Sequence, residues 1–223
     1  MTARGVFVTG TDTGIGKTHA SVALVRAQRA CGRRAIGMKP VASGCRETPE
    51  GLRNEDAEAL LAASDPAPSY RLCNPYAFAP PIAPHIAARE ARIVIALKPI
   101  VAAYGELAAT ADRVVVEGVG GWSVPLSGAL MQADLVRALE LPVVLVVGLR
   151  LGCINHALLS ARAIVADGCV LAGWIANRID PEMEVADANV ATLRERLGVP
   201  MLGDLAHGAR ADASSLAQAA LPL

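Results

Sequence analysis

Short apolar runs alternate along the chain with longer stretches that carry apolar residues at helical spacing. The runs predict strands over residues 5–9, 35–39, 113–117, 143–147, 170–176 and 200–202. The spacing between and after them predicts helices over residues 17–31, 54–63, 100–111, 131–140, 155–166, 185–197 and 211–220. The run at 143–147 is the most apolar, so we expect it at the centre of the sheet. Residues 66–84 contain six prolines, which predict an irregular excursion.

Strands that are apolar throughout are buried on both faces of their sheet. Their alternation with helices predicts an α/β fold with a mostly parallel sheet and helices on both faces. No repeat, linker or low-complexity segment divides the chain, so we predict a single domain over residues 1–223. In such sheets ligands bind beyond the carboxyl ends of the strands. Lys39, Glu117 and Asn177 stand at three of these predicted ends.

The composition excludes several classes of function. Hydrophobic residues make up 53%, enough for a large core, and 21 Lys and Arg balance 21 Asp and Glu. A net charge of zero provides no overall field to recruit nucleic acid or an anionic membrane. No apolar run approaches the roughly 20 residues that cross a bilayer, and the glycine motif follows too soon for a signal peptide. Five cysteines without a C-x-x-C pair favour a reducing cytoplasm over a disulfide framework or a zinc site.

A glycine-rich segment, GTDTGIGKT at residues 10–18, follows the first predicted strand. Its backbone N–H groups can surround phosphates, and the helix that starts near Lys17 adds its positive end. Lys17 would reach the terminal phosphates, and the hydroxyl of Thr18 would bind Mg²⁺. The spacing departs from the standard phosphate loop by one position, because Thr11 stands where the first glycine is expected. A tight turn with an incidental lysine is the alternative, whereas a dinucleotide fingerprint would need a third glycine where His19 stands.

This segment resembles the variant phosphate loop of the dethiobiotin synthetase family, and further motifs of that family follow in order as far as about residue 203. They read KPVASG at 39–44, NED at 54–56, NPYAF at 74–78, APH at 83–85, VEGVGGW at 116–122, GCINH at 152–156 and GWIAN at 173–177. The resemblance implies a P-loop ligase of biotin synthesis, at the penultimate step, that converts 7,8-diaminononanoate, CO₂ and ATP into dethiobiotin, ADP and phosphate with Mg²⁺. The implied path runs through a carbamate and a carbamic–phosphoric anhydride, in a cytoplasmic homodimer.

The resemblance also implies roles for individual residues. The implied catalytic residues are Lys39, Lys17, Thr13 and Ser43, of which the two hydroxyls also contact the substrate's carbamate or the phosphate. The implied nucleotide contacts are Gly14, Ile15, Gly16, Lys17, Thr18, His19, Asp56, Glu117, Gly118, Val119, Gly120, Asn177 and Arg178. The implied Mg²⁺ ligands are Thr18, Asp56 and Glu117. In the family a segment that here includes Gly152, Cys153 and Asn155 reaches across a two-fold interface to the substrate's carboxylate.

General chemistry supports some of these roles and offers ordinary alternatives for others. A fixed ammonium at Lys39 would stabilise the charge that builds on a transferring phosphoryl group, although a lysine at a sheet edge can also reach into solvent. Glu117 follows an apolar strand at the Walker-B position, and carboxylates are hard ligands that suit Mg²⁺; a solvated charge at the start of a loop is the alternative. Asp56 is also an ordinary acid at a helix start, and Asn155 a plausible helix cap.

The match to the family departs at three places. Gly14 stands where many members have an acid, Asn189 stands where an aromatic hydroxyl is common, and residues 205–208 replace a proline-containing adenine loop. A positioning ATPase of the wider superfamily is the second hypothesis, but such proteins usually keep a second lysine near the start of the loop, and residues 10–13 have none. A cobyrinate-type amide synthase needs a glutaminase domain that 223 residues cannot hold. We therefore favour the ligase.

Overall fold

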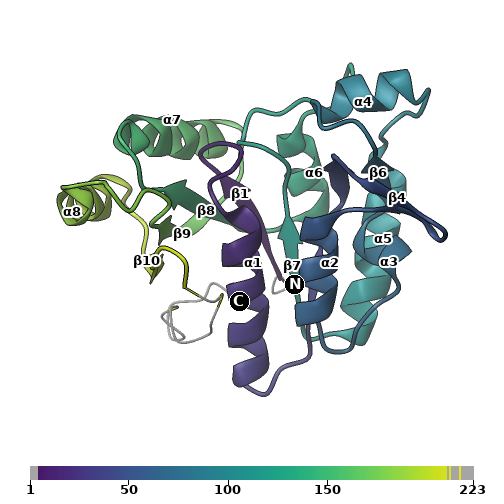
Figure 1. The fold of residues 1–223 in the computed structure, drawn as a ribbon, viewed down its shortest axis with the longest axis horizontal. Helices are drawn as coiled ribbons and strands as arrows, with labels where there is room; N and C mark the ends of the chain where they lie inside the picture. The colour runs from purple at the N-terminus through teal and green to yellow at the C-terminus, as the bar shows by residue number, and fades with distance from the viewer. Residues whose placement is uncertain (1–4, 210, 212–215, 217–223) are drawn as a thin grey trace.

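Six strands form one parallel sheet in the computed structural model, which describes residues 5–209, 211 and 216 (Figure 1). The strand order is β10-β9-β8-β1-β7-β2, and all five pairings are parallel. The strands are β1 (Gly5–Gly10), β2 (Ala35–Met38), β7 (Arg113–Glu117), β8 (Val143–Gly148), β9 (Leu171–Asn177) and β10 (Met201–Leu205). The predicted central place of the run at 143–147 is confirmed, because β8 lies between β1 and β9.

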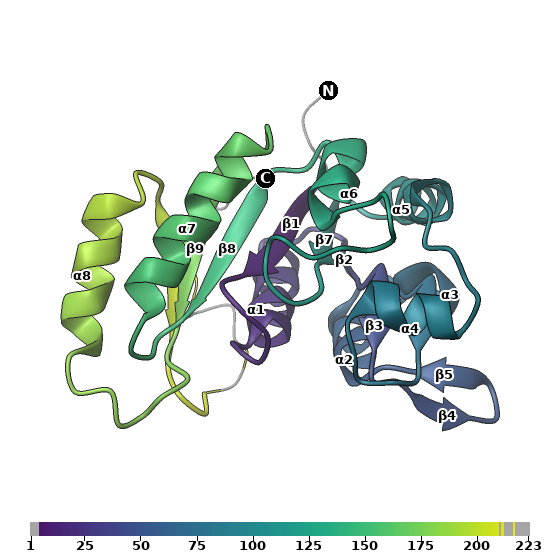
Figure 2. The same cartoon turned by 90° about the horizontal axis from the view of Figure 1, so that it is seen from above.

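Helices cover both faces of this sheet, as Figure 2 shows from above. They are α1 (Lys17–Ala30), α2 (Glu55–Ala63), α5 (Leu97–Thr110), α6 (Gln132–Leu139), α7 (Cys153–Ala166) and α8 (Ala186–Arg196). In β8, Val144 and Val146 belong to the apolar core under α1 and α2, whereas Leu145 belongs to the core under the other four helices. Burial on both faces explains why the strands are apolar throughout. The predicted α/β class with helices on both faces is confirmed.

Small elements extend the molecule beyond the edge strand β2 (Figure 2). They are β3 (Val41–Ser43), β4 (Arg46–Thr48), β5 (Gly51–Arg53), α3 (Tyr70–Cys73), β6 (Tyr76–Phe78) and α4 (Pro84–Glu90). β3 pairs with β6 in parallel, and β4 pairs with β5 in antiparallel fashion. The excursion predicted over residues 66–84 contains two short elements, α3 and β6, that the prolines did not predict. Its prolines fall outside these two elements, and Pro84 opens α4, where a missing N–H costs nothing.

Some predicted boundaries move by a few residues. The strand predicted to end at Lys39 ends at Met38, and the helix predicted from Asn155 starts at Cys153, because Gly152 adopts a left-handed φ of 95° before it. The helix predicted over 211–220 lies outside the described residues, apart from residues 211 and 216. The extent of a single domain over 1–223 stays a prediction. Within the described part of the chain, no helix is long and apolar enough to span a membrane.

Candidate functional site

The loop between β1 and α1 has the geometry of an anion-binding turn. Its first residue, Thr11, donates its backbone N–H to the Val146 carbonyl of β8 at 3.0 Å, which fastens the loop to the sheet. Gly16 has a φ of +81°, and a Cβ there would lie 2.1 Å from Nδ2 of Asn177, so only glycine fits. Residues 17–20 include no acid, so the positive end of α1 is open to an anion.

Lys17 lies in the first turn of α1 and is 7% exposed. Its Nζ donates to the Asp12 carbonyl at 3.0 Å. The carboxylate of Asp12 accepts the Thr13 N–H at 2.7 Å and pairs with Arg150 at 2.6 Å. Burial, and next the ammonium of Lys39, lower the pKa of Lys17 to about 8. A bound polyphosphate would raise the pKa of Lys17 again, because its negative charge stabilises the ammonium where solvent is scarce.

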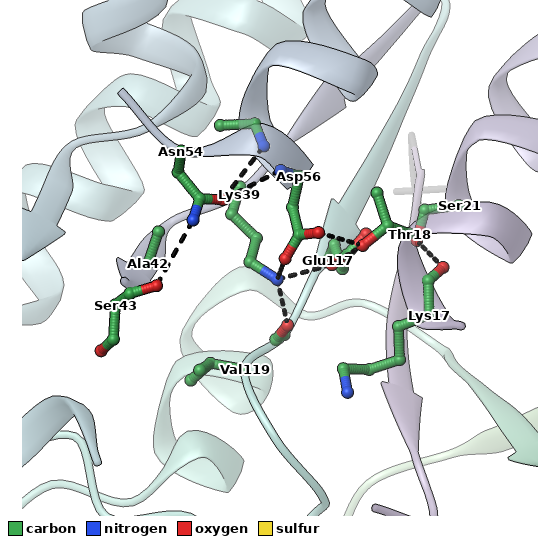
Figure 3. A network of polar contacts seen from close by, with 12 residues as sticks. Lys17, Thr18, Ser21, Lys39, Ala42, Ser43, Asn54, Asp56, Glu117 and Val119 are labelled. Atoms are coloured by element: carbon green, nitrogen blue, oxygen red, sulfur yellow. Dashed lines mark hydrogen bonds and ion pairs between the residues drawn. The ribbon is translucent and has the colours of Figure 1, made fainter. Parts of the chain in front are cut away.

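A second ammonium, that of Lys39, lies between two carboxylates (Figure 3). Its Nζ is 2.5 Å from Oε1 of Glu117 and 3.0 Å from Oδ2 of Asp56, and it donates to the Gly118 carbonyl at 3.1 Å. Burial by itself would lower the pKa of Lys39, but Glu117 and Asp56 raise it above its ordinary value. Burial would likewise raise the pKa of Asp56, but Lys39 and a hydrogen bond from Thr18 lower it. The site therefore keeps a fixed positive charge at Lys39.

Thr18 completes a cluster of oxygen atoms that has more acceptors than donors. Its Oγ1 lies 2.7 Å from Oδ1 of Asp56 and 2.9 Å from Oε1 of Glu117, and one hydroxyl hydrogen can serve only one of them. Oε2 of Glu117 is buried and has no hydrogen-bond partner among the described residues. Oxygen donors of this kind fit Mg²⁺. The described residues contain no group of three or more His, Cys, Asp or Glu side chains placed to bind a metal. Mg²⁺ here would therefore also need oxygens from phosphate or water.

These groups face one cavity of about 770 Å³ at the carboxyl edge of the sheet. The cavity is lined by Thr13, Gly14, Gly16, Lys17, Thr18, Lys39, Ala42, Ser43, Asn54, Asp56, Pro81, Ile82, Ala83, Pro84, Glu117, Val119, Gly120, Gly121 and Val124. Its volume lies within the range of about 300–1,000 Å³ that small-molecule sites occupy. Two ammonium groups, two carboxylates and a glycine-rich loop therefore share one ligand-sized space.

Comparison with known proteins places the chain in a family. A family model described as an AAA domain matches residues 4–213. An ATP-dependent dethiobiotin synthetase of Xanthomonas euvesicatoria pv. vesicatoria (strain 85-10) is 60% identical over 211 residues, 95% of this chain and 94% of the relative. The chain belongs to the dethiobiotin synthetase family. A dethiobiotin synthetase of Xylella fastidiosa (strain M12) is 59% identical over 207 residues, 93% of this chain and 92% of the relative.

Solved structures of lower identity share the fold of this dethiobiotin synthetase family member. The MinC–MinD cell division complex of Aquifex aeolicus matches with a TM-score of 0.56 at 15% identity, over 91% of this chain and 81% of that chain. A ParA family ATPase from Chlorobium tepidum TLS matches with a TM-score of 0.55 at 13% identity, over 92% and 85%. These likenesses confirm the predicted P-loop fold. At 15% and 13% identity these structures show the fold alone. The relatives at about 60% identity are dethiobiotin synthetases and favour the ligase over the positioning ATPase.

Most residues that the family resemblance singled out border the cavity. Eleven of them do so: Thr13, Gly14, Gly16, Lys17, Thr18, Lys39, Ser43, Asp56, Glu117, Val119 and Gly120. They come from the loop after β1, the start of α1, the end of β2, β3, the start of α2, the end of β7 and the loop that follows β7. The hydroxyl of Ser43 is buried without a hydrogen-bond partner among the described residues.

Five predicted nucleotide contacts, Ile15, His19, Gly118, Asn177 and Arg178, lie outside the described lining of the cavity. Ile15 is 1% exposed and packs into the core, and Asn177 donates to its carbonyl at 2.8 Å, so both support the loop from below. The guanidinium of Arg178 pairs with Asp204 and Asp187, at 2.7 and 2.6 Å, in a separate hollow beside α8. A direct nucleotide role for these residues stays a prediction.

The predicted substrate residues Gly152, Cys153 and Asn155 form the start of α7 and also lie outside the described lining of this cavity. Cys153 is buried, and its Sγ lies 3.8 Å from Oδ1 of Asn189. Asn155 is exposed. A substrate contact through this segment stays a prediction.

Sequence reasoning missed Gln132, which supports the cavity from behind. Gln132 is 1% exposed; its Oε1 accepts the Val119 N–H at 2.8 Å, and its Nε2 donates to the Gly121 carbonyl at 2.8 Å. Gln132 thus contacts the backbone of the glycine-rich loop that follows Glu117 at two points. The available signal was a glutamine directly before the apolar face of the helix predicted over 131–140.

Proposed function

We propose that this chain catalyses the ATP-dependent closure of a cyclic urea, in which 7,8-diaminononanoate, CO₂ and ATP give dethiobiotin, ADP and phosphate. The single observation that carries the proposal is the meeting of the phosphate loop, the buried Lys39 and the oxygens of Thr18, Asp56 and Glu117 in one cavity. Relatives at about 60% identity bear the name of this activity. The same comparison supports a role in biotin synthesis.

The phosphate loop would hold the triphosphate of ATP. Backbone N–H groups of the loop after Thr13 and the positive end of α1 would bind the phosphates. Lys17 adds an ammonium that is largely removed from solvent. Thr18, Asp56 and Glu117 would hold Mg²⁺. When bound, Mg²⁺ neutralises charge on the phosphate that is transferred.

The remaining polar groups would position the substrate for three bond changes. An amine of the substrate adds to CO₂ and loses a proton to form a carbamate, whose oxygen attacks the γ-phosphorus and expels ADP. The second amine then attacks the carbonyl carbon of the resulting anhydride, loses a proton and expels phosphate as the ring closes. The Lys39 ammonium would stabilise the negative charge that moves between carbamate and phosphate. The hydroxyls of Thr13 and Ser43 border the same space and would bind the carbamate.

The complete site would need two copies of the chain. The described lining of the cavity around Lys39 does not include Gly152, Cys153 or Asn155. We therefore assign these three residues to the substrate's carboxylate in the site of the partner chain. Asn177 ends β9 and Arg178 follows it, at the same sheet edge as Glu117, where both would lie near the base of the nucleotide. We further propose that the enzyme is a cytoplasmic homodimer.

Mass spectrometry of the product tests this function directly. The chain is incubated with Mg²⁺, ATP, isotopically labelled bicarbonate and 7,8-diaminononanoate, and we expect a labelled cyclic urea together with an equal amount of phosphate. Lys39→Gln should abolish product, whereas Lys98→Gln, which removes an exposed lysine of α5, should leave it unchanged. ATP hydrolysis without the labelled urea would contradict the proposal.

A further inference from the structure

Two segments, residues 39–43 and 54–57, carry Lys39, Ser43 and Asp56 into the cavity, and one side chain from a third segment, residues 70–74, joins them. This side chain is Tyr70, which opens the short helix α3. Its hydroxyl accepts the backbone N–H of Asn54 at 2.7 Å and lies 3.0 Å from Oδ1 of Asn74. A phenol hydroxyl can accept one hydrogen bond and donate another at once. Both contacts can therefore form together.

The first contact leads to Asp56 and Ser43. Oδ1 of Asn54 caps α2 by accepting the N–H groups of Asp56 and Ala57 at 3.1 and 3.3 Å, and its Nδ2 donates to the Ser43 carbonyl at 3.4 Å. Figure 3 shows Asn54 in this place, between Ser43 and the start of the helix that carries Asp56. Asn54 is 7% exposed, so its backbone N–H depends on a protein partner.

The second contact leads to Lys39. Nδ2 of Asn74 donates to the Lys39 carbonyl at 2.6 Å, and Asn74 is 4% exposed. The backbone N–H of Lys39 in turn donates to the Cys73 carbonyl at 2.8 Å. The segment that begins at Tyr70 therefore holds the main chain of Lys39 on both sides.

The ring of Tyr70 is itself fixed. The guanidinium of Arg53 stacks over it, with 4.1 Å between its central carbon and the ring centroid. Burial raises the pKa of Tyr70, so its hydroxyl keeps a proton to donate to Asn74.

We propose that Tyr70 is a positioning residue, whose hydroxyl holds Asp56 and Lys39 at the spacing that a magnesium nucleotide requires. Tyr70 touches neither the nucleotide nor the substrate, because it lies outside the described lining of the cavity. The expected effect on turnover rests on the proposed function. The hydrogen bonds that join the three segments are present in the chain without any ligand.

Tyr70→Phe tests the proposal, since it removes the hydroxyl and keeps the ring. The matched control is Tyr76→Phe, whose hydroxyl accepts the Ala96 N–H at 3.2 Å at the start of α5 instead of joining the three segments. In the free protein, peptides that cover residues 39–43 and 54–57 should exchange their amide hydrogens about two- to tenfold faster in Tyr70→Phe, the factor that one net hydrogen bond gives. They should exchange at the wild-type rate in Tyr76→Phe.

The second arm titrates Mg²⁺ at saturating ATP and diamine and follows the cyclic urea. The half-saturating Mg²⁺ concentration should rise by about the same factor in Tyr70→Phe and stay unchanged in Tyr76→Phe. Unchanged exchange in both peptides overturns the proposal, and so does faster exchange with an unchanged Mg²⁺ titration, which would leave Tyr70 as a structural clamp alone. If the wild-type chain makes no cyclic urea, the proposed function fails, and the exchange arm still decides whether Tyr70 fixes the segments.

Discussion

Two lysine side chains in one cavity have opposite pKa shifts, because their neighbours differ. Lys39 lies against Glu117 and Asp56, which keep its pKa raised, whereas Lys17 has a carbonyl as its hydrogen-bond acceptor and a pKa lowered to about 8. The Lys39 ammonium is neutralised by two carboxylates of the protein. The Lys17 ammonium would gain its counter-charge from a bound phosphate. Lys17 is therefore the residue whose charge should respond to pH and to ATP.

We expect ATP affinity to depend on the proton of Lys17. With a pKa of about 8, Lys17 is charged below this pH and loses its proton above it, so the Kd for ATP should rise at higher pH, by at most about tenfold per pH unit. The unfolded chain keeps this proton up to the ordinary value of 10.5, so over the same range Lys17 makes unfolding less favourable as pH rises.

Calorimetric titration of ATP without Mg²⁺, between about pH 7 and about pH 9.5, measures this dependence. Lys17→Arg provides the control, because a guanidinium stays charged throughout. The Kd should then be flat with pH. If the arginine variant shows the same loss of affinity, the proton of Lys17 is not responsible for it.

At the scale of secondary-structure elements, the site depends on how loops are anchored to rigid strands and helices. The loop after β7 supplies Val119, Gly120 and Gly121 to the cavity, and it has no regular hydrogen-bonding ladder of its own. The side-chain amide of Gln132, in the first turn of α6, pairs with the backbone of this loop at two points. A helix thereby stabilises the shape of a glycine-rich loop.

Gln132→Met should loosen this loop. The change keeps the side-chain volume but leaves the Val119 N–H and the Gly121 carbonyl without their partner, which costs about 1–3 kcal/mol of unfolding free energy. We also expect a several-fold higher KM for the diamine. Urea unfolding and steady-state kinetics measure the two effects.

Gln28→Met is the matched control, because Gln28 is also fully buried but lies in α1, away from the cavity lining. It should alter the unfolding free energy without altering KM. A wild-type KM in Gln132→Met would show that the loop keeps its shape without this anchor.

At the scale of the whole molecule, an exposed apolar surface accompanies the proposed substrate segment. Leu151 is 94% exposed next to Gly152, and Leu159 is 54% exposed on α7, the helix that follows. We expect the proposed homodimer to cover these leucines, because removing large apolar side chains from water favours association. This surface is consistent with the proposed homodimer, in which the start of α7 reaches the partner's cavity.

We expect the chain to sediment as a dimer at micromolar concentration. Leu151→Asp should shift it towards monomer and lower product formation, because a charge would be buried in the contact. Val94→Asp is the control, since Val94 is 77% exposed in the segment before α5. A wild-type chain that is monomeric and fully active in sedimentation and product assays would contradict the dimer.

Local patterns in the sequence were enough to predict the main sheet and the phosphate loop. Buried strands show as apolar runs, and the phosphate-loop motif directly follows one of these runs. Each can therefore be recognised from neighbouring residues alone. β3, β4 and β5 escaped prediction because each has three residues, too few for a period to show. β3 pairs with the distant β6, whereas β4 and β5 pair with each other across the turn at residues 49 and 50.

The sequence by itself determined which residue types enter the site: a loop of glycines with Lys17, and acids or a lysine at the ends of strands. Only the tertiary structure decided which of them meet. Lys39 and Glu117 are separated by 78 residues and Tyr70 and Asn54 by 16, yet each pair is within hydrogen-bond distance. The reason is that hydrogen bonds and ion pairs depend on distances of a few ångströms between elements, which spacing along the chain does not specify.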